Sequence, residues 1–493
     1  MEKQSHKIPH IEDIPKPDAD FVGSEEGAAT HKDKDAIKID FRVKPEELET
    51  YLSKYIVDQE EAVEVLATKI CTHFNRMRLE IEEEVTSDVA LGNIKSNILM
   101  IGPTGVGKTY IIKLIADRIG VPFVKGDATK FSETGYIGGD VENLVRDLVH
   151  EAEGNIPLAE YGIIYIDEID KIASAPNAWG PDVSRSGVQR NLLKLMEETE
   201  VDMKVPHDLA SQMEAVVEAQ RTGKATRKKV NTRNILFVVS GAFDGLIERI
   251  GKRISQQGMG FKSDVGLTSG EKTELLKQVA TRDLIDYGFE SEFIGRLPVT
   301  VTLNELNEES LYTILKNENC AVIQTKKREF RAYGIKLDFK DEALRLLAQQ
   351  AALEKTGARG LLSAIERVLI KFEKKLPTVE VKDLLVTKEL IEKPEKTLKE
   401  IVFEHILSKH SNTFKEQTGI ELTYHRDARK KLSTIYDREG SGLDSHLQEA
   451  LKDYFYGVKL MGISRLVVTR DVLNDPKGTL DRLIKEAYDK KAD

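Results

Sequence analysis

One run of eight residues carries the clearest chemical signal in this chain. It comprises Gly102, Pro103, Thr104, Gly105, Val106, Gly107, Lys108 and Thr109. This is the pattern G-x-x-x-x-G-K-[ST], in which glycines let the backbone turn so that successive N–H groups face a phosphate. Lys108 is the residue type that reaches the β- and γ-phosphates, and the Thr109 hydroxyl is the type that binds Mg²⁺. An isolated match also fits a glycine-rich turn followed by a surface lysine, so the context decides.

The residues on either side of this run favour the phosphate-binding interpretation. The apolar run Ile98–Ile101 precedes it, and a helical pattern that begins at Tyr110 follows it. A strand, a glycine-rich loop and a helix N-terminus together form an anion-binding site. The sequence therefore predicts that the protein binds ATP with Mg²⁺, and we include Tyr110 among the nucleotide-binding residues.

Two adjacent carboxylates supply the second signal. Asp167 and Glu168 follow the apolar run Ile163–Ile166, which is typical of a buried strand. At the carboxyl end of a parallel strand, Asp167 is predicted to hold Mg²⁺, partly through water. Glu168 is then the expected base that polarises the attacking water, with Asp170 as the alternative base. A solvated acidic pair at a strand end is the competing interpretation.

Composition limits the class of protein. The 493 residues are 40% hydrophobic and 32% charged, with a net charge of −10. This acidic balance disfavours a nucleic-acid-binding surface as the main feature. The chain has two cysteines, Cys71 and Cys320, which argue against a disulfide framework and fit a reducing compartment. No apolar run approaches the length of a membrane span, so we expect a cytoplasmic protein with no membrane partner.

The sequence divides into four parts. Residues 1–40 are polar and without period, so we expect them to be disordered. Residues 41–303 alternate apolar runs with amphipathic stretches, which predicts an α/β domain with a parallel sheet. The expected strands are Ile98–Ile101, Val121–Val124, Ile163–Ile166, Ile235–Val239 and Val299–Leu303. Residues 304–394 are mainly helical and include a short expected strand near Asp383–Thr387.

The last part, residues 395–493, repeats the pattern of the helical part. Gly334–Phe339 is echoed by Gly419–Tyr424, and Leu385–Leu390 is echoed by Val467–Val472. Echoes in the same order favour a duplication over chance similarity between helical segments.

Several motifs, taken in order, resemble those of the AAA+ ATPases, and most closely those of the ClpX unfoldase family, with the HslU-type unfoldases as the next relatives. The resemblance covers roughly residues 41–392. The motifs are Tyr55–Glu60, the phosphate-binding loop, Gly135–Gly138, Asp167–Lys171, Ile235–Phe243, Phe293–Pro298 and Gly357–Leu361. The resemblance implies that Tyr55 and Ile56 pack on adenine and that Ser240 is a polar reporter beside the phosphates. It also implies that Arg359 contacts the nucleotide of its own subunit and that Arg296 enters the site of a neighbouring subunit.

The resemblance further implies a translocation pore and a peptidase contact. Tyr136 and Ile137 lie in the segment that looks like the aromatic pore loop, although Tyr136 also fits a core position. Met259, Gly260 and Phe261 fall where the family displays a tripeptide that docks on the ClpP peptidase. The alternative there is that Phe261 packs on its own subunit.

One departure from the family pattern concerns cysteine. The chain has none before Cys71, so we do not expect the four-cysteine zinc module with which many members begin. The repeat, in turn, has Ser441 at the position where the first unit has Arg359. The combined prediction is an ATP-dependent protein unfoldase that works as a hexameric ring on protein substrates and feeds a ClpP-like peptidase. The alternatives are a stand-alone remodeller of protein complexes and a nucleic-acid-linked motor, which the acidic charge disfavours.

Overall fold

The computed structural model describes residues 42–82, 95–132, 140–174, 183–203, 228–257, 269–440 and 442–492. Its first part is built on a five-stranded sheet with the order β2-β3-β6-β1-β7, and every pair of neighbouring strands is parallel. The strands are β1 (Ile98–Ile101), β2 (Phe123–Asp127), β3 (Ile163–Asp167), β6 (Leu236–Gly241) and β7 (Val299–Thr302). The predicted α/β class with a parallel sheet is confirmed, with shifts of one to three residues at strand ends.

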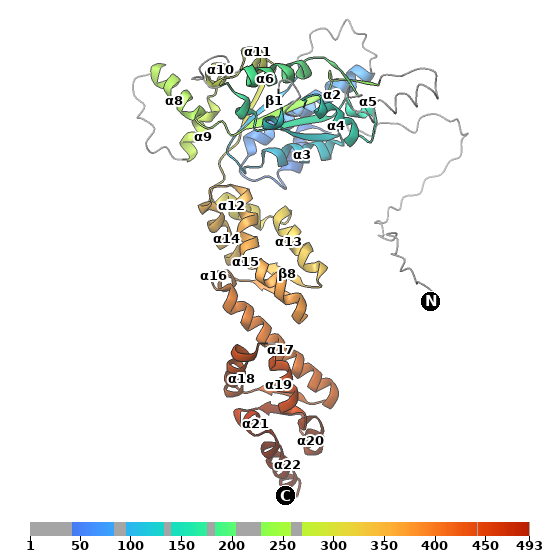
Figure 1. Cartoon of the computed structure of the whole chain (residues 1–493), viewed down its shortest axis with the longest axis vertical. Coiled ribbons are helices and arrows are strands. Elements are labelled where there is room, and N and C mark those ends of the chain that lie inside the picture. The colour runs from blue at the N-terminus through green and yellow to red at the C-terminus, as the bar shows by residue number, and fades with distance from the viewer. Residues whose placement is uncertain are drawn as a thin grey trace, which may run out of the picture. The chain divides into compact units, whose positions relative to one another are not determined.

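Helices cover both faces of this sheet, which explains why its central strands are apolar without alternation (Figure 1). In β1, Ile98 and Met100 belong to one core cluster and Leu99 and Ile101 to the other, because successive side chains of a strand point to opposite faces. The first cluster includes residues of α1 (Pro45–Leu52), α2 (Glu60–Glu82) and α3 (Lys108–Ile119). The second includes residues of α4 (Asn143–Glu151), α6 (Val183–Met196), α8 (Leu246–Gln257), α10 (Thr281–Tyr287) and α11 (Ser291–Gly295).

Shorter elements complete the α/β part. They are η1 (Ala128–Lys130), α5 (Ile156–Ala159), η2 (Ile169–Ile172) and α9 (Ser269–Lys277). A two-stranded antiparallel ribbon pairs β4 (Glu200–Asp202) with β5 (Lys229–Asn231). The sequence did not predict this ribbon, because strands of three residues carry too short an apolar pattern to recognise.

The helical unit that follows contains five helices and a pair of parallel strands. Its elements are α12 (Glu308–Lys316), α13 (Ala321–Ala332), β8 (Lys336–Phe339), α14 (Asp341–Leu353), α15 (Ala358–Val379), β9 (Asp383–Val386) and α16 (Lys388–Glu392). The expected short strand near residue 383 is β9, and β8 pairs with it.

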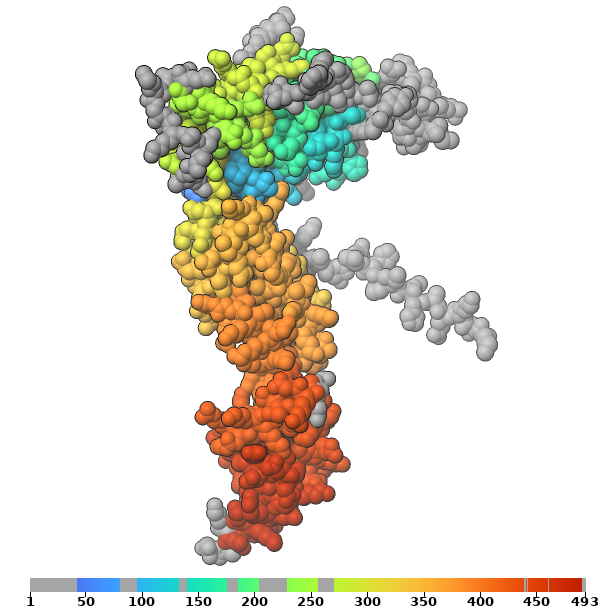
Figure 2. Space-filling view, turned by 60° about the vertical axis from the view of Figure 1, so that its left-hand side comes forward, coloured from blue at the N-terminus to red at the C-terminus, as the bar shows by residue number. Residues whose placement is uncertain are grey.

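The last unit shows a similar order of elements around its two strands. It comprises α17 (Pro394–Thr418), β10 (Glu421–Tyr424), α18 (Arg426–Glu439), α19 (Gly442–Leu451), α20 (Tyr454–Met461), β11 (Arg465–Val468), α21 (Arg470–Asn474) and α22 (Pro476–Ala492). β10 and β11 pair in parallel as β8 and β9 do, while α19 and α20 stand where the first unit has the single helix α15. Figure 2 shows these residues, coloured red, as one packed body. We propose that the two units arose by duplication; the domain boundaries stay a prediction.

The phosphate-binding loop is tied to the start of α15 by backbone contacts. The Ala358 N–H donates to the Gly105 carbonyl at 2.9 Å. Gly105 has φ of +81°, and a Cβ there would lie 2.0 Å from the Thr356 carbonyl oxygen. Glycine at position 105 therefore allows both the positive φ of the loop and its close approach to the helical unit.

We expect Gly105→Ala to weaken nucleotide binding, because the added Cβ has to separate the loop from Thr356. Gly154→Ala is the matched control, since Gly154 has φ of +82° and a Cβ added there would meet nothing within 4 Å. Both substitutions cost about 1–3 kcal/mol of backbone strain. Titration with a fluorescent ADP, alongside thermal unfolding, separates the two effects. Equal nucleotide affinity in the two variants would contradict this role of Gly105.

Candidate nucleotide-binding site

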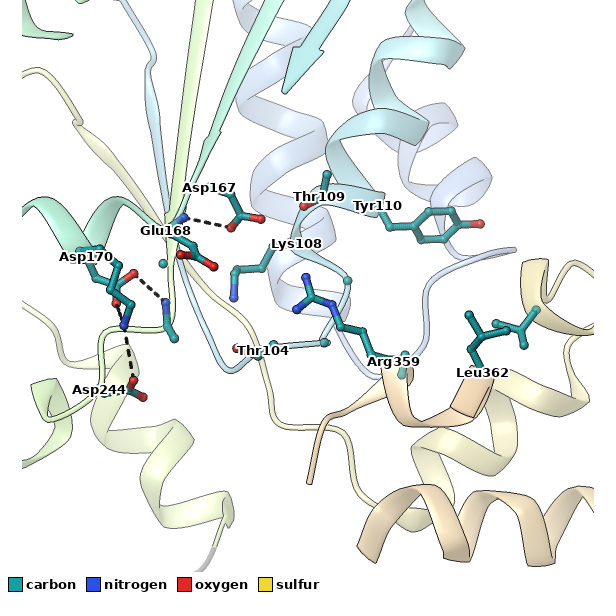
Figure 3. A pocket seen from close by; sticks show the side chains of 17 residues that line it. Thr104, Lys108, Thr109, Tyr110, Asp167, Glu168, Asp170, Asp244, Arg359 and Leu362 are labelled. Carbon is teal, nitrogen blue, oxygen red and sulfur yellow. Dashed lines mark hydrogen bonds and ion pairs between the residues drawn. The ribbon is translucent and has the colours of Figure 1, made fainter. Parts of the chain in front are cut away.

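A cavity of about 440 Å³ opens at the carboxyl edge of the sheet. Its lining residues from the α/β part include Thr104, Gly105, Gly107, Lys108, Thr109, Tyr110, Asp167, Glu168 and Asp170, and those from the helical unit include Ala358, Arg359 and Leu362. Because β1, β3 and β6 are neighbours and parallel, the loop after β1 and the carboxylates after β3 meet at this edge. Segments far apart in the sequence therefore form one site (Figure 3).

Lys108 lies at the N-terminus of α3, beside the loop. Its ammonium donates to the carbonyl oxygens of Gly102 at 2.6 Å and Pro103 at 2.9 Å. Burial lowers the pKa of Lys108, and the nearby charges of Asp167 and Asp170 act in the opposite direction. A phosphate beside this ammonium would favour its charged form, and the N–H groups of the first turn of α3 would in turn favour the phosphate.

Asp167 has the surroundings of an ionised metal ligand. Burial acts to raise its pKa, but hydrogen bonds from Lys125 and Ser240 outweigh burial, so the pKa lies below its ordinary value. Ser240 Oγ donates to Asp167 Oδ1 at 2.9 Å, and the Glu168 N–H donates to the same oxygen at 3.1 Å. The Thr109 hydroxyl lies on the same side of the cavity as the Asp167 carboxylate (Figure 3). A carboxylate and a hydroxyl are hard oxygen donors, so these residues fit Mg²⁺.

Tyr165 links these groups from inside the sheet. Its hydroxyl accepts from Thr109 Oγ1 at 3.1 Å and lies 2.6 Å from Ser240 Oγ. The ring is fully buried. In the sequence Tyr165 is only part of an apolar strand, because nothing in the residue order indicates that its hydroxyl reaches both neighbouring segments.

The two candidate bases, Glu168 and Asp170, differ in whether their carboxylates can reach the cavity. Glu168 is exposed to the cavity and stands in the left-handed region, with φ of 58°. The Asp170 side chain is only 1% exposed, pairs with Lys171 at 3.0 Å and accepts from the Ala242 N–H at 3.3 Å. Asp170 therefore holds the turn after β6, and Glu168 is the carboxylate that can reach a water molecule in the cavity.

A second, apolar pocket of about 200 Å³ adjoins the first. Gly107, Tyr110, Val322 and Ala358 line both. Tyr55 and Ile56, which were predicted to contact adenine, lie in the apolar pocket with Val57, Val106, Leu306, Ile314 and Leu361. A polar, cationic cavity next to an apolar one matches the phosphate and base ends of a nucleotide. Val322 and Leu306 were missed, because their place depends on how the helical unit folds.

The two predicted arginines lie in different places. Arg359 extends into the cavity opposite Lys108 (Figure 3). Arg296 follows α11 and pairs with Glu197 at 2.6 Å, with its side chain 54% exposed, and it does not line the cavity of its own chain. Ser240 also lies outside the lining, because it is fully buried in β6 and acts on the cavity through Asp167.

Several predicted site residues are not among the residues that the structure describes. Tyr136, Ile137, Met259, Gly260, Phe261 and Ser441 lie outside the described residues, as do residues 1–40. In the part of the chain that is described, no helix is both long enough and apolar enough to cross a membrane. Both cysteines, Cys71 and Cys320, are buried and free.

The sheet order, the phosphate-binding loop and the paired acidic residues define an ATPase of the AAA+ class. Comparison with known families agrees: the family of the AAA domain (Cdc48 subfamily) matches residues 93–300, and that of the C-terminal D2-small domain of ClpB protein matches residues 306–372. The chain is also 39% identical over 352 residues to the ATP-dependent Clp protease ATP-binding subunit ClpX of Treponema denticola. That alignment covers 70% of this chain and 81% of the relative. The chain belongs to the ClpX family of AAA+ ATPases.

The contrast between the two carboxylates gives a matched pair of variants. Glu168→Gln should keep ATP binding and lose hydrolysis by about 10²–10⁴-fold, because it removes the expected base and leaves the phosphate-binding loop intact. Asp170→Asn should instead lower the thermal unfolding temperature, because it weakens the contacts with Lys171 and Ala242. Phosphate release and differential scanning fluorimetry measure the two effects. Hydrolysis at the wild-type rate in Glu168→Gln would assign the base to another residue.

Proposed function

We propose that this protein is an ATP-dependent unfoldase that works as a ring, most simply a hexamer, and pulls polypeptide through a central pore. The observation that supports a ring is that Arg359 and Arg296 lie in different places. Arg359 lines the cavity of its own chain, while Arg296 lies elsewhere with its guanidinium half-exposed. An arginine that completes a neighbour's site makes hydrolysis depend on assembly.

In this mechanism the nucleotide lies across the two pockets, with its base against Tyr55 and Ile56. Lys108 and the loop N–H groups bind the phosphates. Thr109 and Asp167 would hold Mg²⁺, which would supply stabilisation of the phosphate charge. Glu168 orients and polarises the attacking water. Arg296 of the adjoining subunit stabilises the charge that develops on the transferred phosphoryl group.

The same cavity provides a route from hydrolysis to movement. It is lined by the α/β part on one side and by Arg359 and Leu362 of α15 on the other. Loss of the γ-phosphate removes an interaction partner from Lys108 and Arg359 together, so the two sides have a different preferred separation before and after hydrolysis. That change is the step that we propose drives the pore residues Tyr136 and Ile137 along a substrate chain.

A ClpP-like peptidase is the partner that we propose for Met259, Gly260 and Phe261. Met259 and Phe261 are apolar, and apolar side chains gain free energy when a partner buries them. A ring multiplies weak contacts. A stand-alone remodeller of protein complexes needs no such contact and stays the second proposal. The net charge of −10 supports protein rather than nucleic acid as the substrate. The two free cysteines support the proposed cytoplasmic location.

Mixing two inactive variants tests the arginine in trans. Arg296→Ala should bind nucleotide yet hydrolyse about 10³–10⁵-fold more slowly. Subunits with Glu168→Gln keep Arg296, so mixing the two variants should restore some ATPase activity at sites between them. Arg282→Ala, which removes an exposed arginine of α10, is the control. A concentration-independent, fully active monomer would exclude the ring.

Unfolding itself is tested with a tagged, stable fluorescent protein. Wild-type protein with ATP should abolish its fluorescence when a ClpP-like peptidase is present to prevent refolding. Tyr136→Ala should keep most ATPase activity and fail in this assay, because we propose that its aromatic ring grips the substrate chain and has no part in hydrolysis. Unfolding that survives the substitution would remove Tyr136 from the pore, and ATPase activity stimulated by DNA would favour the nucleic-acid motor.

A further inference from the structure

A lysine that the proposed mechanism does not use lies beside both proposed magnesium ligands. Lys125 is the central residue of β2 and is paired in register with Tyr165 of β3. Its Nζ lies 2.9 Å from Asp167 Oδ2 and 3.4 Å from Thr109 Oγ1. One ammonium therefore contacts the carboxylate oxygen and the hydroxyl oxygen through which we propose that Mg²⁺ is held.

We propose that Lys125 competes with Mg²⁺ for Asp167 and Thr109, and so sets the magnesium concentration at which this chain loads its nucleotide. The proposal rests on the nucleotide site described above and adds a determinant of its metal affinity. Lys125 acts on metal binding indirectly, through its contacts with Asp167 and Thr109.

The hydrogen bonds of Asp167 leave one oxygen for this competition. Oδ1 accepts from Ser240 and from the Glu168 N–H, whereas Oδ2 faces Lys125. An ammonium carries three donors and no lone pair, so it can neutralise the carboxylate but cannot serve as a ligand to the metal. Mg²⁺ and the ammonium are both cations, and they cannot share Oδ2 at close range without repulsion.

The exposure of the two side chains shows which partner can move. The Lys125 side chain is 42% exposed, whereas that of Asp167 is 16% exposed and is held by two further hydrogen bonds. A long, flexible side chain at the cavity rim can turn into solvent at little cost. Lys125 would have to leave Asp167 Oδ2 for Mg²⁺ to bind there, and its positive charge close by would still weaken metal binding.

Binding of a fluorescent ADP at a series of Mg²⁺ concentrations tests this competition without depending on hydrolysis. In Lys125→Met, the Mg²⁺ concentration for half-maximal binding should fall by about two- to fivefold, the size expected for a partly exposed ion pair. Lys125→Arg keeps the charge and should stay close to wild type. Lys130→Met is the matched control, because Lys130 is an exposed lysine of the neighbouring η1 and its substitution removes the same charge. Mn²⁺ binding, measured by electron paramagnetic resonance with saturating ADP, should likewise be tighter in Lys125→Met than in the wild type, Lys125→Arg or Lys130→Met.

Three results would overturn the proposal, and each has a distinct meaning. An unchanged Mg²⁺ dependence in Lys125→Met, with wild-type folding by circular dichroism, would make Lys125 a surface ion pair only. Weaker ADP binding in EDTA for Lys125→Met would show that the lysine contacts the nucleotide phosphates instead. If ADP binding to the wild type does not respond to Mg²⁺ at all, the magnesium site itself is wrong, and this proposal falls with it.

Discussion

The carboxylate of Asp167 is the point on which the arrangement of the site depends. It stands at the end of a strand whose preceding residues are fully buried, and it receives hydrogen bonds from β6, from the next residue in the chain and from Lys125 of β2. These donors keep the carboxylate ionised despite its partial burial. Because the donors come from neighbouring strands, any change in strand order would disperse them.

A second constraint is that neither part of the chain forms the nucleotide pocket alone. The loop after β1 supplies Lys108 and the N–H groups that we propose bind phosphate, whereas Val322, Ala358 and Leu361 of the helical unit supply apolar walls. A backbone hydrogen bond between Ala358 and Gly105 fixes the point where the two parts meet. A nucleotide in this position would contact both sides, which is the physical requirement for coupling hydrolysis to a change in their separation.

The last unit repeats the topology of the first helical unit in a different setting. Its strands pair in the same parallel way, and its helices bury Phe414, Leu432 and Leu447, which belong to the same core cluster as residues of the first helical unit. Both cavities described above are lined by residues from the α/β part and the first helical unit, with none from α17 to α22. The repeated unit thus keeps the fold of the first helical unit but lines neither cavity. This supports a structural or docking role for it.

Sequence alone determined the elements with strong local patterns. Uninterrupted apolar runs predicted the strands of the parallel sheet, because strands covered on both faces have no polar side. The loop from Gly102 to Thr109 and the Asp167-Glu168 pair were found from residue types at fixed spacing, since their chemistry depends on local geometry. The ribbon of β4 and β5 was missed, because its two short strands pair across a long interval in the sequence.

Only the tertiary structure decided which residues act together. It placed Asp170 in a structural contact and Glu168 exposed at the cavity, a distinction that neighbouring acidic residues cannot reveal in sequence. It brought Lys125 and the Tyr165 hydroxyl to Thr109 and Asp167, although each of the two lies in the middle of a strand. The reason is that side-chain contacts at the edge of a parallel sheet follow strand order and register, and no local pattern in the sequence specifies either.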